Sequence, residues 1–197
     1  MLKVNSTTRV RRLRVASVLL AAALTLQCSV ALSEEVAAAG RLEVAFSPDG
    51  GAQALLLRVI SSAHHDVRVL SYTFTSSPVT KALIAARGRG VTVSIVADAK
   101  NNLQEDQSGR ARQALTDLAR AGCDVRVIDA FALQHDKLLI VDSRTTELGS
   151  FNYTGAADRR NSETMLVVWD NPELARRSLE HFARNYALST PFVGDAR

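Results

Sequence analysis

The chain has 197 residues, of which 47% are apolar and 22% charged. This composition is that of a globular protein and excludes collagen-like, disordered and coiled-coil chains, while two cysteines are too few for a disulfide scaffold. The formal net charge of +4 would favour a nucleic-acid partner, but five of the 24 basic residues, and no acidic residue, fall within positions 1–33. The rest of the chain is close to neutral, so its overall charge gives no evidence for such a partner.

Segment 1–33 has the order of features that is typical of a secretory signal peptide. Basic residues between Lys3 and Arg14 precede an apolar run over 15–26, and small residues follow around 31–33. The run is short for a bilayer span, which needs about 20 residues; an uncleaved anchor or an amphipathic helix is the alternative. We therefore expect cleavage near 31–33 and an exported protein, periplasmic or secreted, without stable membrane association after cleavage.

Beyond this segment the chain alternates between strand and helix patterns and then changes to a hairpin. Strands are expected at 42–46, 67–74, 91–97, 125–128, 137–141, 146–148 and 164–169. Helices are expected at 52–63, 77–86, 108–121 and 171–186, and the polar segment 101–107 is expected to be a mobile loop. The pattern predicts a single α/β domain over 40–190, in which helices flank both faces of a mixed β-sheet, and a C-terminal tail at 191–197.

Six residues form the pattern H-x-K-x4-D-x6-G-S-x-N: His135, Lys137, Asp142, Gly149, Ser150 and Asn152. In a strand, His135 and Lys137 point to the same face, so an imidazole that can attack phosphorus stands beside an ammonium that can hold a phosphate oxygen. The hydroxyl of Ser150 and the amide of Asn152 can bind the remaining oxygens. Asp142 lies at an odd separation from Lys137 and is expected to face away and brace a turn or an interface, while Gly149 allows a close approach of the backbone.

Other catalytic patterns are missing from the sequence. It has no Gly-rich phosphate loop, no G-x-S-x-G elbow, and no group of His, Cys, Asp and Glu at metal-site spacing. We therefore expect neither a metal nor another cofactor. His64, His65 and His181 are interpreted as solvated or structural, and Cys123 as a lone buried thiol.

The six-residue signature resembles that of the phospholipase D superfamily, and residues 41–190 resemble its small, single-motif endonuclease branch, known as Nuc. The resemblance implies metal-independent hydrolysis of a phosphodiester through a phosphohistidine on His135. It also implies that Glu163 hydrogen-bonds this imidazole and that Asp142 is structural. The superfamily takes a second histidine from a second motif, whereas this chain has one, so a homodimer with a composite active site is expected.

The substrate is less well defined by the sequence than the chemistry. DNA is favoured as the substrate, with RNA as a second nucleic acid, by the resemblance and by basic pairs at Arg87/Arg89, Arg110/Arg112 and Arg159/Arg160. The alternative is a phospholipase D that hydrolyses phosphatidyl head groups by the same chemistry, for which 131–133 is the best candidate for an apolar rim. A third interpretation, an exported nucleic-acid-binding protein without catalysis, conflicts with the intact motif.

Overall fold

The computed structural model describes residues 33–194, so the expected signal peptide, except for Ser33, and the last three residues of the expected tail lie outside the described residues. The elements follow the chain in this order: β1 (Arg41–Ser47), α1 (Ala52–Ser61), β2 (Asp66–Ser71), α2 (Ser77–Gly88), β3 (Thr92–Asp98), the π-helix η1 (Lys100–Glu105), α3 (Arg110–Arg120), β4 (Asp124–Ile128), β5 (Lys137–Val141), β6 (Thr145–Gly149), α4 (Gly155–Arg159), β7 (Glu163–Trp169), α5 (Pro172–Leu188) and β8 (Thr190–Pro191).

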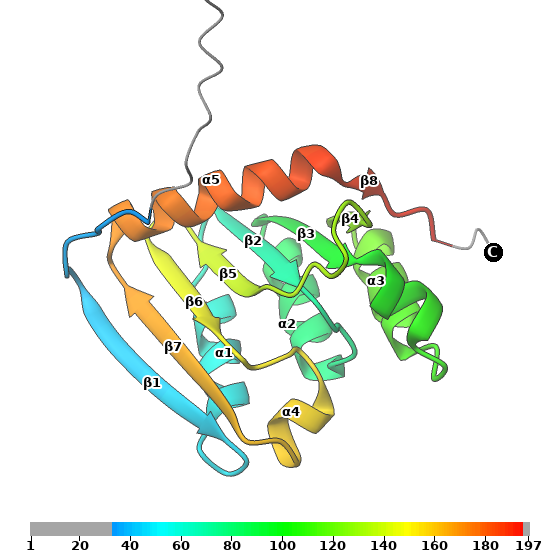
Figure 1. Ribbon diagram of the computed structural model, residues 1–197, viewed down its shortest axis with the longest axis horizontal. Helices are drawn as coiled ribbons and strands as arrows, with labels where there is room; N and C mark the ends of the chain where they lie inside the picture. Colours follow the sequence, from blue (N-terminus) through cyan, green and yellow to red (C-terminus); the bar gives the residue numbers. More distant parts are fainter. Residues whose placement is uncertain (1–32, 195–197) are drawn as a thin grey trace, which may run out of the picture. The chain divides into compact units, whose positions relative to one another are not determined.

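The strands form one mixed sheet in the order β1-β7-β6-β5-β2-β3-β4-β8. The neighbours β2, β3 and β4 run parallel, and the other pairs are antiparallel. Helices α1, α2 and α3 bury the larger apolar core against one face, and α5 covers a smaller cluster on the other face (Figure 1). The predicted α/β fold, with helices on both faces of a mixed sheet, is confirmed.

Apart from β2, which ends at Ser71 and not at 74, and β8, which forms where no strand was expected, two segments differ from the sequence prediction. Residues 101–107, expected to be a mobile loop, largely belong to η1, whose Asn102 side chain is buried and bonded to backbone groups of other segments. The buried amide of Asn102 orders this segment through internal hydrogen bonds, although Gln104, Glu105 and Gln107 are exposed to solvent. The short helix α4 was not expected, because it begins with Gly155 and lasts five residues; the side chain of Thr154 caps it by accepting a hydrogen bond from the Ala157 N–H at 3.0 Å.

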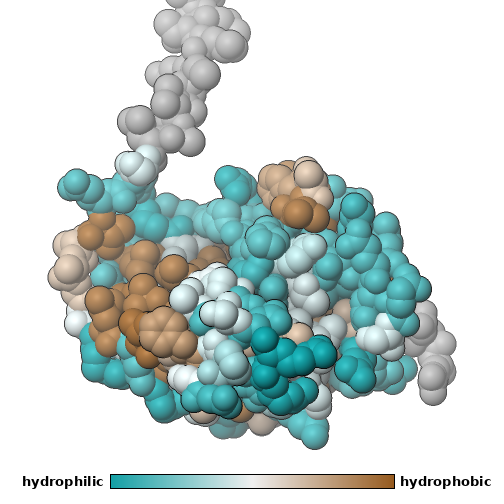
Figure 2. All heavy atoms as spheres, turned by 60° about the horizontal axis from the view of Figure 1, so that its bottom comes forward, coloured by the Kyte–Doolittle hydropathy of each residue, from teal (hydrophilic) through white to brown (hydrophobic). Residues whose placement is uncertain are grey.

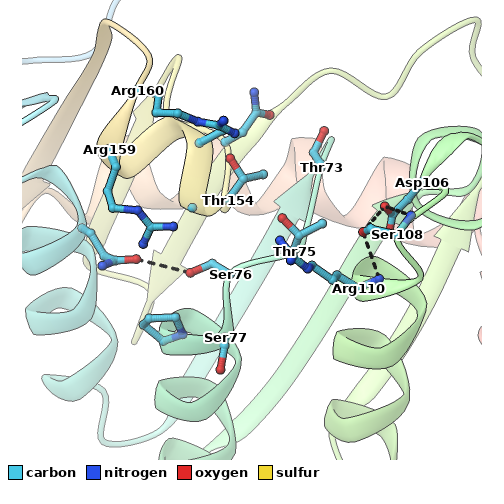
Figure 3. A pocket seen from close by; sticks show the side chains of 15 residues that line it. Thr73, Thr75, Ser76, Ser77, Asp106, Ser108, Arg110, Thr154, Arg159 and Arg160 are labelled. Carbon is cyan, nitrogen blue, oxygen red and sulfur yellow. Dashed lines mark hydrogen bonds between the residues drawn. The ribbon is translucent and has the colours of Figure 1, made fainter.

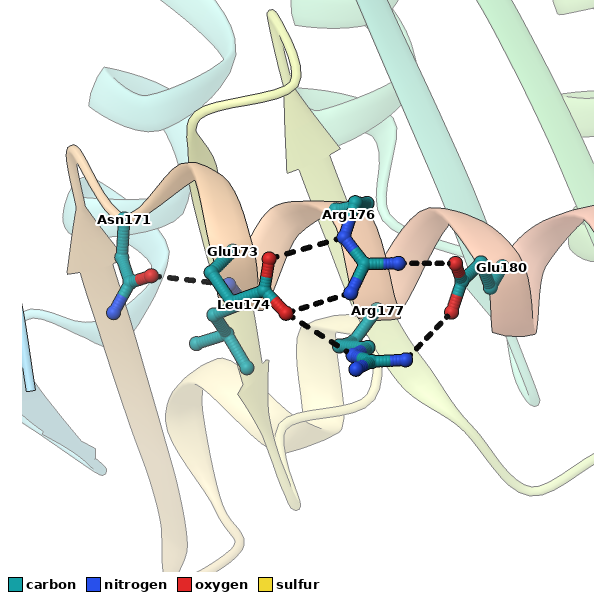
Figure 4. Close-up of polar contacts among 6 residues, drawn as sticks. All are labelled: Asn171, Glu173, Leu174, Arg176, Arg177 and Glu180. Carbon is teal, nitrogen blue, oxygen red and sulfur yellow. Dashed lines mark hydrogen bonds and ion pairs between the residues drawn. The ribbon is translucent and has the colours of Figure 1, made fainter. Parts of the chain in front are cut away.

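Helix α5 is held straight across the sheet by its own polar side chains. Asn171 caps the first turn by accepting a hydrogen bond from a backbone N–H (Figure 4). On the exposed side, Arg176 and Arg177 each form ion pairs with both Glu173 and Glu180. These two arginines are thus neutralised within the helix and add little attraction for an external anion.

The face of the sheet that α5 occupies stays uncovered at the β1 edge. Leu42, Val44 and Phe46 of β1 are 66%, 55% and 53% exposed, and Val44 lies opposite the partly buried Leu166 of β7. Figure 2 shows apolar side chains gathered at the left of the molecule, the side of β1 in Figure 1. We call Leu42, Val44, Phe46 and Leu166 the apolar patch. None of the helices formed by residues 33–194 combines the length and apolar character needed to cross a membrane.

Candidate active site

His135 and Lys137 meet at the start of β5, around the ring of Tyr72. His135 lies just before the strand, is exposed, and has its ring centroid 4.6 Å from that of Tyr72. The Nζ atom of Lys137 lies 5.0 Å from the same Tyr72 ring and donates a hydrogen bond to the backbone oxygen of His135 at 2.8 Å. The structure therefore brings the imidazole and the ammonium together, as the two-residue spacing predicts, although His135 precedes the regular strand.

The side chain of Lys137 is largely shielded from water. The residue is 7% exposed, and its burial lowers the pKa of the ammonium, while the carboxylates of Asp136 and Glu163 act in the opposite direction. A cation that has already lost much of its water interacts more strongly with an incoming phosphate oxygen. The position suits electrostatic stabilisation of a pentacoordinate phosphorus.

The second half of the motif returns to the same end of the sheet on β6. Leu138 pairs with Leu148 in the β5–β6 hairpin, so Gly149 and the residues after it come back beside Lys137. At Gly149 the strands β6 and β7 approach so closely that a Cβ atom would lie 2.3 Å from the carbonyl oxygen of Thr164. The close approach expected of this glycine is thus to the neighbouring strand.

Glu163 and Ser150 have different partners from those expected. The Ser150 hydroxyl donates a hydrogen bond to Glu163 Oε2 at 2.6 Å and accepts one from the Thr164 N–H at 3.0 Å. Asn161 donates to the other carboxylate oxygen of Glu163 at 3.0 Å. Within the described chain no hydrogen bond joins Glu163 to His135, and the Ser150 proton points to a carboxylate. Glu163 is the first residue of β7 and lies beside the end of β6, so the pairing of these two strands places it next to Ser150.

Asn152 is half-buried and faces a groove next to the motif. Its Oδ1 atom is buried and has no hydrogen-bond partner among residues 33–194, so this end of the amide is not engaged by another protein group. Tyr153, the next residue, is fully buried; its hydroxyl donates to Glu147 Oε2 at 2.8 Å, and its backbone oxygen accepts hydrogen bonds from the N–H groups of Thr75 and Ser76. The Asn152 loop is therefore fixed to the loop that carries Tyr72.

Asp142 acts at the opposite end of β5. Its carboxylate accepts hydrogen bonds from the backbone N–H groups of His64, His65 and Asp66 at 2.8, 2.7 and 2.9 Å. Burial would raise the pKa of this carboxyl, but the three N–H groups outweigh it and hold the pKa below its ordinary value. The side chain thus braces the α1–β2 turn, away from the site, as expected, although the reason is that Asp142 lies in the turn after β5, with φ 51°, and not the alternation of a strand.

Two polar residues that the sequence did not single out hold the loops of the site. The buried Asn102 donates hydrogen bonds to the backbone oxygens of Tyr72 and Asp98 and accepts one from the Phe74 N–H. Asp98, 2% exposed, accepts a hydrogen bond from the Gln134 N–H at 2.8 Å, next to His135. No sequence spacing marks these residues, because each acts through backbone groups that are distant in the chain.

The remaining histidines and the cysteine mostly follow the expectation. His64 is exposed, and Cys123 is buried, with burial raising the pKa of its thiol to about 11. His181 is more engaged than expected: its Nε2 lies 3.2 Å from Asp136 Oδ2, so α5 contacts the residue between His135 and Lys137. Residues 33–194 contain no group of three or more His, Cys, Asp or Glu side chains arranged to hold a metal ion.

A polar groove of about 590 Å³ opens beside Asn152 (Figure 3). It is formed by the β2–α2 loop, the segment from η1 into α3, and the segment from the Asn152 loop into α4. Its lining residues are Gln53, Thr73, Thr75, Ser76, Ser77, Pro78, Asp106, Ser108, Arg110, Asn152, Thr154, Gly155, Ala156, Arg159 and Arg160. Arg110 reaches in from one side, and Arg159 and Arg160 lie on the other. The structure thus gathers members of two basic pairs, distant in sequence, around one groove.

Comparison with known proteins agrees with this geometry. The family model described as "Cardiolipin synthase, PLD-like domain" matches residues 56–186. The chain is 32% identical over 147 residues to "Phospholipase D" of Rickettsia conorii, which covers 75% of this chain and 70% of that protein. It is 31% identical over 179 residues to the human "Mitochondrial cardiolipin hydrolase", with 86% and 68% covered. The crystal structure of Nuc from Salmonella typhimurium, a phospholipase D family member, has 39% identity and a TM-score of 0.74 over 77% of this chain and 97% of that one.

The fold, the motif and these relatives together define a phosphodiester hydrolase. The family model covers more than half of the chain, and the expected resemblance is confirmed. The chain belongs to the phospholipase D superfamily.

Proposed function

We propose that the protein is an exported endonuclease that hydrolyses the phosphodiester bonds of nucleic acid, with DNA favoured over RNA. The observation that carries the proposal is the His135–Lys137 pair around Tyr72, next to Thr73, which together with Asn152 lines a groove rich in hydroxyl and guanidinium groups. The guanidinium groups of such a lining suit a polyanionic strand. The resemblance to the Nuc branch supports the same choice.

The proposed reaction has two displacements at phosphorus. The imidazole of His135 attacks, a P–N bond forms, and the P–O bond to the leaving alkoxide breaks as a second imidazole gives that alkoxide a proton. Water then attacks the phosphohistidine, loses a proton to the second imidazole, and the P–N bond breaks. Lys137 and the amide of Asn152 hold the non-bridging oxygens, so we expect turnover without a metal ion.

The second imidazole is proposed to come from a second copy of the chain. One motif supplies one His135, and the two displacements need imidazoles on opposite sides of phosphorus. The apolar patch supports self-association, because the exposed side chains of Leu42, Val44 and Phe46 form a continuous stripe that ends near the site. In a C2 dimer such a surface is buried against its own copy.

The proposal is tested with the purified chain on plasmid DNA and on phosphatidylcholine vesicles, both in excess EDTA. We expect nicking of DNA by the wild type, loss of nicking in His135→Asn, and no loss in the control His65→Asn, which changes an exposed histidine outside the site. Hydrolysis of the vesicles without nicking of DNA would show that the substrate is a phospholipid and not a nucleic acid. Activity that needs added Mg²⁺ would contradict the metal-free mechanism.

The shared site has its own test in a mixed dimer of wild type and His135→Asn. A composite site with a single imidazole is expected to accumulate phosphohistidine without full turnover. Independent sites would instead give about half the wild-type rate per dimer. A fully active monomer, measured by light scattering at the assay concentration, would also contradict the shared site.

A second candidate, a phospholipase D, is favoured by one specific observation. Phe131 and Leu133, directly before His135, are 40% and 47% exposed, so the segment 131–133 is not part of the core and could contact a lipid surface. The names of the relatives, a phospholipase D and a cardiolipin hydrolase, agree with this candidate. The vesicle experiment above separates the two.

Export is proposed on the sequence pattern alone. The basic start, the apolar run over 15–26 and the small residues near 31–33 favour cleavage and release from the cytoplasm. N-terminal sequencing of protein recovered from the periplasm or the medium tests this; a chain that still begins at Met1 there would refute cleavage.

A further inference from the structure

Three arginines without a close ion pair among residues 33–194 line the polar groove beside Asn152. Neither Arg110 nor Arg160 forms an ion pair with any residue of the described chain, and Arg159 reaches Asp158 only at 4.0 Å, with 74% of its side chain exposed. These guanidinium groups differ from Arg176 and Arg177 on α5, which are paired with glutamates (Figure 4). The groove arginines are therefore free to bind an anion.

The one carboxylate in the lining is already engaged. Asp106 accepts hydrogen bonds from the Ser108 N–H and hydroxyl and from the Ala111 N–H, at 3.0, 2.5 and 2.7 Å. It therefore shapes the turn into α3; burial raises its pKa, but these hydrogen bonds and the charge of Arg110 outweigh burial and lower it, and it forms no ion pair with Arg159 or Arg160 among the described residues. The lining keeps a surplus of positive charge over the length between α3 and α4.

The remaining lining residues are uncharged. In Figure 3, Thr75 and Thr154 lie between Arg110 and Arg160, with Thr73 and Ser76 on either side. No aromatic side chain lines the groove, so it offers no platform on which a base could stack. The hydroxyl groups of Thr73 and Ser76 already donate to Asn101 and Gln53, so the guanidinium groups are the main donors of the lining, and they match the phosphates of a nucleic-acid strand and not its bases.

We propose that this groove binds the phosphate backbone of the substrate strand next to the scissile bond, with Arg110 and Arg160 each holding a flanking phosphate. The inference rests on the proposed nuclease function and adds the path of the strand and the mode of recognition. Asn152 lies both in the motif and in the lining, so it marks the end of the groove at which the scissile phosphate sits. Binding through the backbone makes cleavage independent of base sequence.

The test measures binding apart from catalysis. In a His135→Asn background, a fluorescent oligodeoxynucleotide is titrated by anisotropy against the double variant Arg110→Gln/Arg160→Gln. The control Arg112→Gln/Arg144→Gln removes the same charge, from a residue of α3 outside the groove and from the β5–β6 turn, where Arg144 pairs with Asp170. We expect roughly tenfold weaker binding for the groove variant, a slope of log Kd against log salt smaller by about 1.5 to 2, and little change for the control.

An abasic oligonucleotide of equal length serves as competitor and is expected to compete as well as the normal strand. Much weaker competition by it would overturn backbone recognition, and equal losses in the groove variant and the control would overturn the assignment of the site to the groove. Loss of binding to anionic vesicles, with oligonucleotide binding unaffected, would assign the arginines to lipid head groups.

A catalytic assay keeps this inference separable from the proposed function. With His135 intact, the cleavage rates of Arg110→Gln/Arg160→Gln and of wild type are measured on the oligonucleotide and on bis(p-nitrophenyl) phosphate, which has no flanking phosphates. We expect the ratio of polymer to small-diester activity to fall roughly tenfold. An unchanged ratio would refute the groove while leaving the nuclease intact. Wild type that cleaves neither DNA nor RNA would refute the proposed function. The binding titration would still show whether the groove binds the strand.

Discussion

The buried pair of Glu147 and Tyr153 predicts an unusual dependence of stability on pH. Both side chains are fully buried, and the Tyr153 hydroxyl donates to one oxygen of Glu147, while the other oxygen has no partner among the described residues. Burial raises the pKa of Glu147 to about 8, against the lowering effect of the tyrosine hydrogen bond. The folded protein therefore keeps this carboxyl protonated at neutral pH.

The sign and size of the effect follow from proton linkage. Between about pH 4.5 and pH 8 the folded state retains a proton on Glu147 that the unfolded state has lost. The free energy of unfolding then falls by about 1.4 kcal/mol for each unit of rising pH, or roughly 4 kcal/mol from pH 5 to pH 8 as an upper bound. Above pH 8 the group contributes no further slope.

The perturbation is Glu147→Gln, which keeps the shape and an acceptor for the Tyr153 hydroxyl but cannot ionise. Urea unfolding of wild type and variant is compared at the same protein concentration from pH 5 to pH 8. The free energy of unfolding of the variant is expected to increase relative to that of wild type as the pH rises. The introduced amide N–H groups add a difference that does not depend on pH, so they do not affect this trend. Other titrating groups are common to both proteins and cancel in the difference. Parallel curves for the two proteins would refute the burial of a neutral carboxyl at this position.

Three further substitutions test the framework of the site. Gly149→Ala would place a Cβ atom 2.3 Å from the Thr164 carbonyl oxygen, so we expect a loss of about 1–3 kcal/mol in urea unfolding. Asp142→Asn is expected to cost about 1–3 kcal/mol at neutral pH; because the folded pKa of Asp142 is lowered, wild type and variant should converge as the pH falls through that pKa. Asn102→Ala leaves backbone groups of Tyr72 and Phe74 without partners, and both stability and kcat are expected to fall, with KM for a small diester less affected.

Sequence patterns predicted the fold well where the spacing of apolar residues fits only a strand or only a helix. The strand and helix periods predicted the regular elements of the sheet and its covering helices to within a few residues, except at β2, which ends at Ser71 and not at 74. The six-residue motif predicted both the meeting of His135 with Lys137 and the remote bracing role of Asp142. The two-residue spacing keeps His135 on the face of Lys137 although it precedes β5, whereas Asp142 lies away from the site because it belongs to the turn after β5, with φ 51°.

The hydrogen-bond partners of polar side chains could not be predicted in the same way. Ser150 can donate to a phosphate or to a carboxylate, and only the pairing of β6 with β7 shows that Glu163 takes its proton. Asn102 and Asp98 are ordinary polar residues in the sequence, and their importance depends on backbone groups that are more than 25 positions away. Such partners are a property of the folded chain, because a polar group that is buried accepts whichever donor the topology brings to it.

The spacing of the motif is itself explained by the hairpin. The four residues between Lys137 and Asp142 are the rest of β5, so His135 and Lys137 lie at one end of this strand and Asp142 at the other. The turn after Asp142 sends the chain back, and Leu138 pairs with Leu148, which returns Gly149 to the level of Lys137. Asp142 fixes the far end of the hairpin to the α1–β2 turn. The spacing is thus the length of one strand and its return, and an added residue within β6 would move Ser150 and Asn152 to the wrong face relative to the imidazole.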